Sequence, residues 1–341
     1  MAKAIRASQA ELEAAVDALR DGELVAFPTE TVYGLGANAA NPAAVRKVFE
    51  LKGRPPSHPL IVHIDQQKYL KRWVREIMPV AEKLAEAFWP GPLTLVLPRS
   101  ESVHDIITGG QDSIAIRIPS HPMAQQLLDA FGGGIAAPSA NRYGRLSATR
   151  AEHVLDEFGD AVKVILDGGE SQLGLESTIV SCLDGEVRLL RPGAVTLGQL
   201  RAVAGEVAIG ADKSSPRVPG STVSHYAPTT PLTIVPGGEL DALADSLSQG
   251  GQRIAVLAQR LPLKTYETVT WINAGKRADA FGHDLYANLR ALDKAGCARI
   301  LVQEVPGDER WDAVRDRLAR AAVSAPSDSG PYAALGTGVL P

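Results

Sequence analysis

The sequence has very few cysteines, no long hydrophobic run and no excess of positive charge. Only Cys182 and Cys297 occur among its 341 residues, and no Cys-x-x-Cys pair is present. The sequence therefore indicates neither a disulfide framework nor a cysteine-based zinc site. No stretch approaches the roughly 18 consecutive apolar residues of a membrane-spanning helix. The net charge of -4 argues against a protein that holds nucleic acid through its overall electric field.

Two further signals are missing. The sequence has no Gly-x-x-x-x-Gly-Lys-Ser/Thr loop of the P-loop type. Residues 1–20 lack the apolar segment of a signal peptide, and Ser8 with Glu11 instead fits a capping box that begins an amphipathic helix. We therefore expect a cytoplasmic protein. The hydrophobic fraction of 45% and the charged fraction of 22% are typical of globular proteins, and the length suits two domains.

The most informative stretch is rich in hydroxyl groups and glycine: Phe27-Pro-Thr-Glu-Thr-Val-Tyr-Gly-Leu-Gly36. It follows a predicted strand at residues 24–27 and is predicted to be a turn. Asn41 and Pro42 predict the start of a helix, and Gly53 followed by Pro55 predicts its end. This unit and its continuation to residue 63 collect hydroxyls, a tyrosine, two cations and two histidines, which is the layout of a binding site.

Two features of this unit have more than one interpretation. Lys52 and Arg54 follow the predicted helix and could hold an anion, or they could only complement the helix dipole. The run from Gly34 to Ala39 matches a loose dinucleotide fingerprint. That match is weak, because the helix begins later, at Asn41, and no acidic residue follows at the distance that a ribose contact requires.

Downstream, predicted strands and helices alternate, and polar side chains follow several of the strands. Ser139 and Asn141 come after a short apolar strand, and Ser177 and Arg191 lie at the ends of a predicted hairpin. Each of them could be an ordinary turn residue. Because the arrangement recurs at so many strand ends, we interpret it as a binding site.

Composition predicts where the domains divide. Residues 211–230 are rich in proline, serine, threonine and glycine, with no sustained apolar period. We therefore predict a first domain at 1–210, a linker at 211–230 and a second domain at 231–341 that ends in a mobile tail. Strands and helices alternate again in the second domain, which predicts a parallel α/β fold. Arg315, Arg317 and Arg320 on its last helix are predicted to form a solvated face.

The motifs together resemble the YrdC-type superfamily and, within it, the long, two-domain form of the threonylcarbamoyl-AMP synthase family. The resemblance covers both predicted domains. It rests on the stretch at 27–36, Lys52-Gly-Arg-Pro55, Pro59-Leu-Ile-Val-His63, Ser139-Ala-Asn141, Gly174-Leu-Glu-Ser-Thr-Ile-Val180, Arg191-Pro-Gly193 and His225-Tyr-Ala-Pro228. It implies a twisted YrdC-like α/β catalytic domain followed by a smaller Rossmann-like parallel α/β domain.

The resemblance also implies roles for individual residues. The catalytic signature motifs contribute Lys52, Arg54, Ser139 and Asn141. The implied threonine pocket contains Thr31, His63, Arg117, Ala137 and Ser177. The implied ATP pocket contains Arg54, His58, Ser113, Ser139, Ser147, Arg191 and Tyr226. The chain departs from the family at His58, where asparagine is common, and at residues 221–224, which lack the usual basic and aromatic side chains.

The implied reaction condenses L-threonine, bicarbonate or CO2, and ATP to threonylcarbamoyl-AMP and pyrophosphate. The product serves the t6A modification of tRNA at the adenosine 3′ of the anticodon, after transfer to a tRNA threonylcarbamoyl-transferase complex. Mg2+ is expected with ATP. Glu30 and Glu176 are neighbouring carboxylates but no firm metal ligands. A weak contact with tRNA is compatible with this scheme, and no membrane is involved.

Three other functions compete with this one. The same basic pocket could bind RNA without catalysis, although the acidic composition and the lack of interleaved aromatics argue against it. Carbamoyl transfer in hydrogenase maturation would require zinc-finger cysteines and an acylphosphatase-like segment, which the sequence lacks. A dinucleotide-dependent dehydrogenase depends on Gly34 and Gly36 alone.

Overall fold

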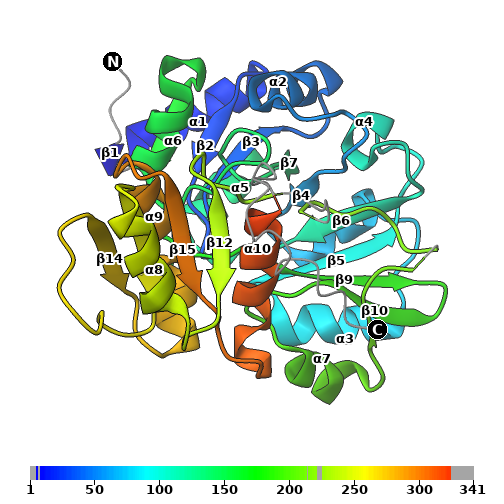
Figure 1. Ribbon diagram of the computed structural model, residues 1–341. Coiled ribbons are helices and arrows are strands. Elements are labelled where there is room, and N and C mark those ends of the chain that lie inside the picture. The colour runs from blue at the N-terminus through cyan, green and yellow to red at the C-terminus, as the bar shows by residue number, and fades with distance from the viewer. Residues whose placement is uncertain (1–4, 7, 213, 221–224, 324–341) are drawn as a thin grey trace. The chain divides into compact units, whose positions relative to one another are not determined.

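The computed structural model describes residues 5–6, 8–212, 214–220 and 225–323. Contacts divide the chain into two compact units. The first unit comprises residues 1–143 and 147–222, and the second comprises residues 144–146 and 223–341. Figure 1 labels the helices and strands of both units. Residues 221–224 and 324–341, on which the sequence analysis also made predictions, lie outside the described residues.

The first unit is built on a mixed sheet in the order β1-β8-β2-β3-β7-β4-β6-β5-β9-β10-β11. Its strands are β1 (Ile5–Arg6), β2 (Val25–Phe27), β3 (Gly34–Asn38), β4 (Ile61–His63), β5 (Leu93–Pro98), β6 (Ser113–Arg117), β7 (Ile135–Ala136), β8 (Val164–Asp167), β9 (Thr178–Leu183), β10 (Glu186–Arg191) and β11 (Ala208–Ile209). The mixture of parallel and antiparallel neighbours confirms an α/β domain.

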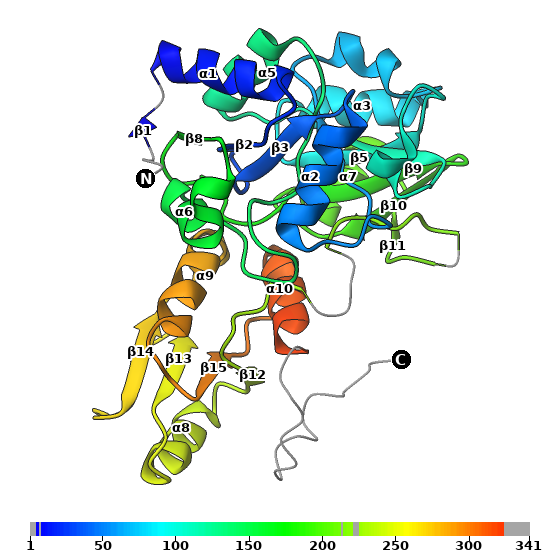
Figure 2. The same cartoon turned by 90° about the horizontal axis from the view of Figure 1, so that it is seen from above.

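The helices of the first unit come from the segments between these strands. They are α1 (Gln9–Arg20), α2 (Pro42–Lys52), α3 (Pro79–Phe88), α4 (Asp105–Thr108), α5 (Pro122–Phe131), α6 (Ala151–Phe158) and α7 (Leu197–Ala204), with 3-10 turns at Gln67–Arg72 and Gly159–Ala161. Helices α1 and α5 pack against each other (Figure 2). Their apolar residues share one core cluster with Phe27 of β2, which ties these helices to the sheet.

Helix α2 follows the sequence prediction closely. The Asn41 side chain accepts hydrogen bonds from the amides of Ala43 and Ala44, and Pro42 is the first helical residue. Gly53 ends the helix in the left-handed conformation, which glycine adopts without strain. Lys52 is therefore the last helical residue, and Arg54 lies just beyond the helix.

The predicted glycine-rich turn is wrong in its second half. Residues Gly34–Asn38 form strand β3, which pairs antiparallel with β2. A Cβ atom at Gly36 would lie 2.8 Å from Cγ2 of Ile135 and 2.9 Å from Cε1 of Phe27. Glycine is thus needed in β3 because side chains of neighbouring strands occupy the space. Gly34 and Gly36 are not at a helix N-terminus, as a dinucleotide loop would require.

The second unit has a parallel sheet in the order β12-β15-β13-β14. Its elements are β12 (Leu232–Val235), α8 (Leu240–Gln249), β13 (Ile254–Ala258), β14 (Val269–Asn273), α9 (Ala278–Asp293), β15 (Arg299–Gln303), a 3-10 turn at Glu309–Trp311 and α10 (Asp312–Ala322). This confirms the predicted parallel α/β fold of the second part. No helix among the residues described in either unit is long and apolar enough to cross a membrane.

The prediction of a solvated arginine face on α10 is wrong for Arg317. Its side chain is fully buried, with a relative exposure of 0%, and is ion-paired with Asp316 at 2.5 Å. Its guanidinium lies 5.1 Å from the centre of the Tyr226 ring, a cation–π distance. Tertiary packing therefore overrides the charge pattern of this helix.

The turn after β10 needs glycine for a close backbone contact. A Cβ atom at Gly193 would lie 2.4 Å from the Thr178 amide nitrogen and 2.8 Å from the Glu176 carbonyl oxygen. These are backbone atoms, which cannot move aside as the flexible end of a side chain can. The contact brings residues 191–193 against the segment that contains Ser177.

We expect Gly193→Ala to lower the free energy of unfolding by about 2 kcal/mol or more, because it forces these backbones apart. Urea denaturation checks this. Gly238→Ala is the matched control, because its Cβ atom would meet no neighbour and its backbone is not left-handed; we expect a change within about 0.5 kcal/mol. A Gly193→Ala protein with the wild-type urea midpoint would contradict the packing argument.

Candidate functional site

The turn after β2 is organised by hydrogen bonds of two threonines. The Thr29 hydroxyl donates to the Val32 carbonyl at 2.6 Å and lies 2.8 Å from the Thr31 hydroxyl. Because Thr29 gives its only proton to Val32, the proton between the two threonines comes from Thr31. The Thr31 oxygen therefore has only acceptor capacity left for other groups.

Arg117, at the end of β6, is buried and held by two other segments of the first unit, the turn after β2 and the loop before β5. Its Nη1 donates to the Thr31 hydroxyl oxygen at 2.7 Å, and its Nε donates to the Gly91 carbonyl at 3.1 Å. Its Nη2 lies 2.7 Å from Oε1 of Glu30, which makes a buried ion pair. Burying an arginine requires such compensation. The resemblance had placed Arg117 in the threonine pocket, without its buried partner Glu30.

His63 lies next to Arg117 in the sheet, and Ala137 is hydrogen-bonded to the strand that carries His63. Strands β4 and β6 run parallel with His63 opposite Arg117, and the Ala137 amide donates to the Ile61 carbonyl at 2.9 Å. His63 is buried, and burial together with the positive charge of Arg117 lowers its pKa to about 3. The imidazole is therefore neutral at neutral pH. Four of the five residues implied for the threonine pocket are joined by these contacts.

The fifth, Ser177, joins the same group through the loop before β5. The amide of Thr178 donates to the Pro92 carbonyl at 2.9 Å, and the preceding carbonyl, of Gly91, accepts from Arg117. The Ser177 hydroxyl lies 2.7 Å from that of Thr94. Arg191 donates from Nη2 to the Ser177 carbonyl at 2.8 Å and to its hydroxyl at 3.1 Å. The structure thus places Arg191, assigned to ATP, against a residue assigned to threonine.

Lys52 clamps the loop that carries Ser139 and Asn141. Its Nζ donates to the Ser139 carbonyl at 2.6 Å and also to the Asn141 carbonyl. In return, the amide of Tyr143 donates to the Lys52 carbonyl at 2.8 Å. Burial, with the nearby charge of Arg54 as a second cause, holds the pKa of Lys52 well below its usual value. The Lys-x-Arg and Ser-x-Asn motifs are therefore one structural unit.

Arg54 lies in an aromatic setting. Its Nη2 donates to the Pro59 carbonyl at 2.9 Å, and its guanidinium is 5.8 Å from the centre of the Tyr143 ring. The Tyr143 hydroxyl is 3.1 Å from Nδ1 of His58. Partial burial and the charge of Arg54 lower the pKa of His58, so this ring is neutral at neutral pH.

Ser113 lies at the opposite end of β6 from Arg117. Four residues of strand separate them, which corresponds to about 13 Å. Ile61 of β4 lies opposite Ala115 of β6, and the two strands run parallel. Pro59 comes two residues before Ile61, and Ser113 comes two residues before Ala115. Ser113 is therefore at the end of the strand pair where Arg54 donates to the Pro59 carbonyl. A buried arginine therefore lies at each end of the strand pair: Arg117 at the end of β6, and Arg54 against Pro59, ahead of β4. Between these ends, Ile61, Val96, Ala115, Ile179 and Leu190 of the sheet form a buried apolar cluster with Val218.

Ser147 lies in a segment that is hydrogen-bonded to the residues that follow the β2 turn. The amide of Tyr33 donates to the Ala148 carbonyl at 2.8 Å, and the amide of Leu35 donates to the Pro138 carbonyl at 2.8 Å. The Ser147 hydroxyl donates to the Glu176 carboxylate. Both ends of the 138–148 segment are thus anchored beside Thr31.

Tyr226 is the one predicted site residue that belongs to the second unit. It is buried, with a positive φ of 60°, and its ring is 6.0 Å from that of Tyr286. The linker segment at 217–219 belongs to the first unit: the Arg217 amide donates to Gln111, and the Pro219 carbonyl accepts from Arg191 at 2.9 Å.

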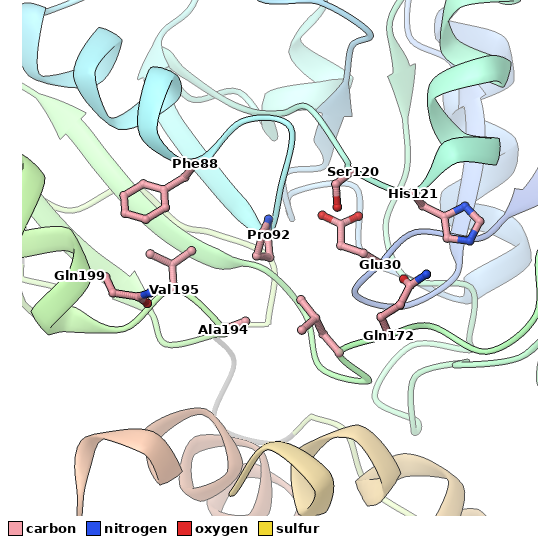
Figure 3. A pocket seen from close by; sticks show the side chains of 10 residues that line it. Glu30, Phe88, Pro92, Ser120, His121, Gln172, Ala194, Val195 and Gln199 are labelled. Carbon is pink, nitrogen blue, oxygen red and sulfur yellow. The ribbon is translucent and has the colours of Figure 1, made fainter.

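A cavity of about 470 Å³ opens beside this group, at the ends of several strands of the first unit (Figure 3). It is lined by Glu30, Phe88, Pro92, Ser120, His121, Gln172, Leu173, Ala194, Val195 and Gln199. Sequence reasoning missed this set, because its members come from several loops and from helices α3 and α7, which are far apart in the sequence. The one signal for it was Glu30, which is adjacent to Thr31.

Comparison with known proteins gives a consistent result. Residues 17–193 match the Sua5_yciO_yrdC family model, described as telomere recombination. Residues 195–323 match the model described as threonylcarbamoyl-AMP synthase, C-terminal domain. The two models meet within two residues of each other and cover both units.

Among curated proteins, the threonylcarbamoyl-AMP synthase of Pyrococcus abyssi is 38% identical over 93% of this chain and 95% of its own length. That of Bacillus subtilis is 41% identical over 89% of this chain and 90% of its own length. The crystal structure of P. abyssi Sua5 complexed with L-threonine matches with a TM-score of 0.88 at 37% identity, covering 95% of this chain and 97% of that one. The chain therefore belongs to the threonylcarbamoyl-AMP synthase family of nucleotidyltransferases and carries both of the family's domains.

Proposed function

We propose that this protein condenses L-threonine, bicarbonate or CO2, and ATP to threonylcarbamoyl-AMP and pyrophosphate. The observation that carries the proposal is the strand pair β4 and β6, with Arg117 at one end and Arg54 at the other. A small amino acid and a nucleotide, both anionic, can meet along such a strand pair. The relative solved with L-threonine, 37% identical to this chain, supports the choice of amino acid.

At the Arg117 end we assign the threonine substrate. A guanidinium has five N–H groups; Gly91 and Thr31 accept from two of those of Arg117, and Glu30 faces Nη2 as an ion-pair partner. Leaving one N–H of Nη2 to that ion pair, we assign the two others, among the described contacts, to the carboxylate of threonine. The Thr31 oxygen can only accept, so it suits the amino group or the carbamate N–H. His63 is neutral, so it adds no charge that would repel an ammonium group.

At the Arg54 end we assign the nucleotide. The Lys52 ammonium donates to two carbonyls and thereby holds the loop from which Ser139 and Asn141 reach the phosphates. Arg54 and Ser113 lie at this end, and we assign Arg191 and Ser147 to the nucleotide as well, although their contacts are with Ser177 and Glu176. Tyr226 is assigned to the nucleotide by family resemblance. Charge neutralisation and alignment would supply the catalysis, because no nucleophile and base pair is required.

The proposed chemistry has two steps. The neutral amine of threonine adds to the carbon of CO2 and releases a proton, or it adds to bicarbonate and one water leaves, formed from the amine proton and the hydroxyl of bicarbonate. Either route gives the N-carboxylate. A carbamate oxygen then attacks the α-phosphorus of ATP, and the bond to the bridging oxygen breaks. Pyrophosphate leaves with that oxygen, and threonylcarbamoyl-AMP remains.

We propose that Mg2+ enters as part of the substrate, bound to the phosphates of ATP. The two carboxylates closest in sequence to the site motifs are already engaged: Glu30 is ion-paired with Arg117, and Glu176 accepts from Ser147. Oxygen atoms of the triphosphate are therefore the better ligands for the ion.

We further propose that the product serves t6A modification of tRNA in the cytoplasm. A mixed anhydride of this kind is hydrolysed easily, so it has to be handed to a tRNA threonylcarbamoyl-transferase complex. A weak contact with tRNA would assist this transfer.

The direct test is pyrophosphate release from MgATP. We expect release that requires both L-threonine and bicarbonate, with serine a poorer substrate because it lacks the methyl group. A coupled phosphate assay, with each component omitted in turn, measures this. Bound ATP without threonine-dependent release, together with salt-dependent retention of RNA, would refute the proposal and favour the RNA-binding alternative.

Substitution of the two ends of the site tests the residue assignment. We expect Arg54→Ala and Ser177→Ala each to lower kcat/KM about a hundredfold or more, because both groups face developing or fixed negative charge. Arg46→Ala, an exposed arginine on α2, is the control and should retain activity. Unchanged melting temperatures are required. Near-wild-type turnover in either site variant would show that the assignment is wrong.

The buried neutral His63 predicts a pH dependence of stability. Its pKa of about 3 in the folded protein lies below the value of about 6.5 in the unfolded chain. The unfolded state therefore binds more protons between pH 3 and 6.5, and stability falls as the pH is lowered through that range. The contribution is at most about 1.4 kcal/mol per pH unit. Urea midpoints between pH 7 and 4.5 should fall less steeply for His63→Gln than for the wild type; equal slopes would contradict a neutral buried His63.

A further inference from the structure

The carboxylate of Glu30 has a stronger connection to Arg117 than to any other charged group described. The two side chains are 7% and 4% exposed, and the ion-pair distance is 2.7 Å. The turn that carries Glu30 is itself anchored, because the Leu173 amide donates to the Glu30 carbonyl at 2.8 Å. The position of the carboxylate is therefore set by the backbone on both sides of the β2 turn.

Glu30 and Thr31 hold the two outer nitrogens of one guanidinium. Thr31 accepts from Nη1, Glu30 faces Nη2, and the Gly91 carbonyl accepts from Nε. Because the guanidinium is planar, three contacts from two segments, the turn after β2 and the loop before β5, fix both its position and its orientation. Removal of the carboxylate would leave a buried arginine without compensation for its charge.

The cavity described above lies on the Glu30 side of this ion pair. Glu30 is one of its walls, and Figure 3 shows the carboxylate pointing toward Ser120, with His121 and Gln172 nearby. Neither carboxylate oxygen of Glu30 accepts a hydrogen bond within the described part of the chain, and Nη2 of Arg117 makes none there, so the contact of 2.7 Å between them is an ion pair. His121 uses Nδ1 to accept from the Met123 amide at 3.2 Å. Arg117 is thus the group that balances the carboxylate.

We propose that Glu30 is a positioning residue for substrate binding: its carboxylate holds Arg117 in the orientation in which the two remaining N–H groups meet the carboxylate of threonine. This inference rests on the proposed function for the identity of the ligand. The ion pair and the cavity that carry it are independent of that function.

The cavity provides a sharp test by chemical rescue. Glu30→Ala removes a CH2–COO group, whose size and charge acetate matches. Since the removed group lines a cavity of about 470 Å³, added acetate has room to reach Arg117. We expect Glu30→Ala to raise the KM for threonine about tenfold or more, with a smaller effect on kcat. Acetate in the tens of millimolar should restore a large part of the loss.

Three controls isolate the charge. Acetamide, which has the same shape without the charge, should not restore activity. Arg117→Ala should not respond to acetate, because it lacks the partner. Glu30→Gln fills the site with a neutral side chain, so it should show a raised KM for threonine without rescue. If the KM of Glu30→Gln lies within twofold of the wild-type value, the positioning role is refuted.

A second readout does not depend on activity. Acetate should raise the melting temperature of Glu30→Ala but not that of Arg117→Ala or of the wild type, because it binds only where a buried arginine lacks its partner. Stabilisation of Glu30→Ala by acetate, together with a wild-type protein that shows no threonine-dependent pyrophosphate release, would keep the ion-pair inference and refute the proposed function. A Glu30→Ala protein that loses activity and shows neither rescue nor stabilisation would refute the inference itself.

Discussion

Arginine and lysine side chains can be buried only where backbone carbonyls and other side chains compensate their charge, and the first unit is arranged around this constraint. Arg117 draws together the turn after β2, the loop before β5 and the end of β6. Lys52 draws the end of α2 to the loop after β7 through two carbonyls. Each cation costs free energy to desolvate, so the contacts that compensate it also fix the loops that form the site.

The same constraint gives the motifs their spacing. Lys52 and Arg54 flank Gly53, whose left-handed conformation turns the chain at the helix end. As a result Lys52 faces the Ser-x-Asn loop while Arg54 reaches the Pro59 carbonyl ahead of β4. Two cations that are close in sequence thereby bind different segments of the chain, the Ser-x-Asn loop and the residues ahead of β4. Their mutual repulsion contributes to the lowered pKa of Lys52.

Local signals predicted much of this arrangement, and long-range packing decided the rest. Asn41 and Gly53 marked the ends of α2 because caps are short-range features. The strand from Gly34 was missed, because glycine disfavours strands unless neighbouring side chains fill its space. The burial of Arg317 depends on Tyr226, distant in sequence. Glu30 was recognised only as a carboxylate, since its partner Arg117 lies 87 residues away by numbering (117 minus 30).

The placement of the cations also bears on the kind of ligand. Proteins that bind nucleic acid polymers present exposed lysines and arginines, so that many phosphates are reached at once. Here Lys52, Arg54, Arg117 and Arg191 are each almost fully buried and bonded to backbone carbonyls or side chains within the first unit. A polymer cannot reach such groups, whereas a small anion that enters the site can. The net charge of -4 then acts as a general repulsion toward polyanions, and selectivity for small anionic substrates follows from burial rather than from overall charge.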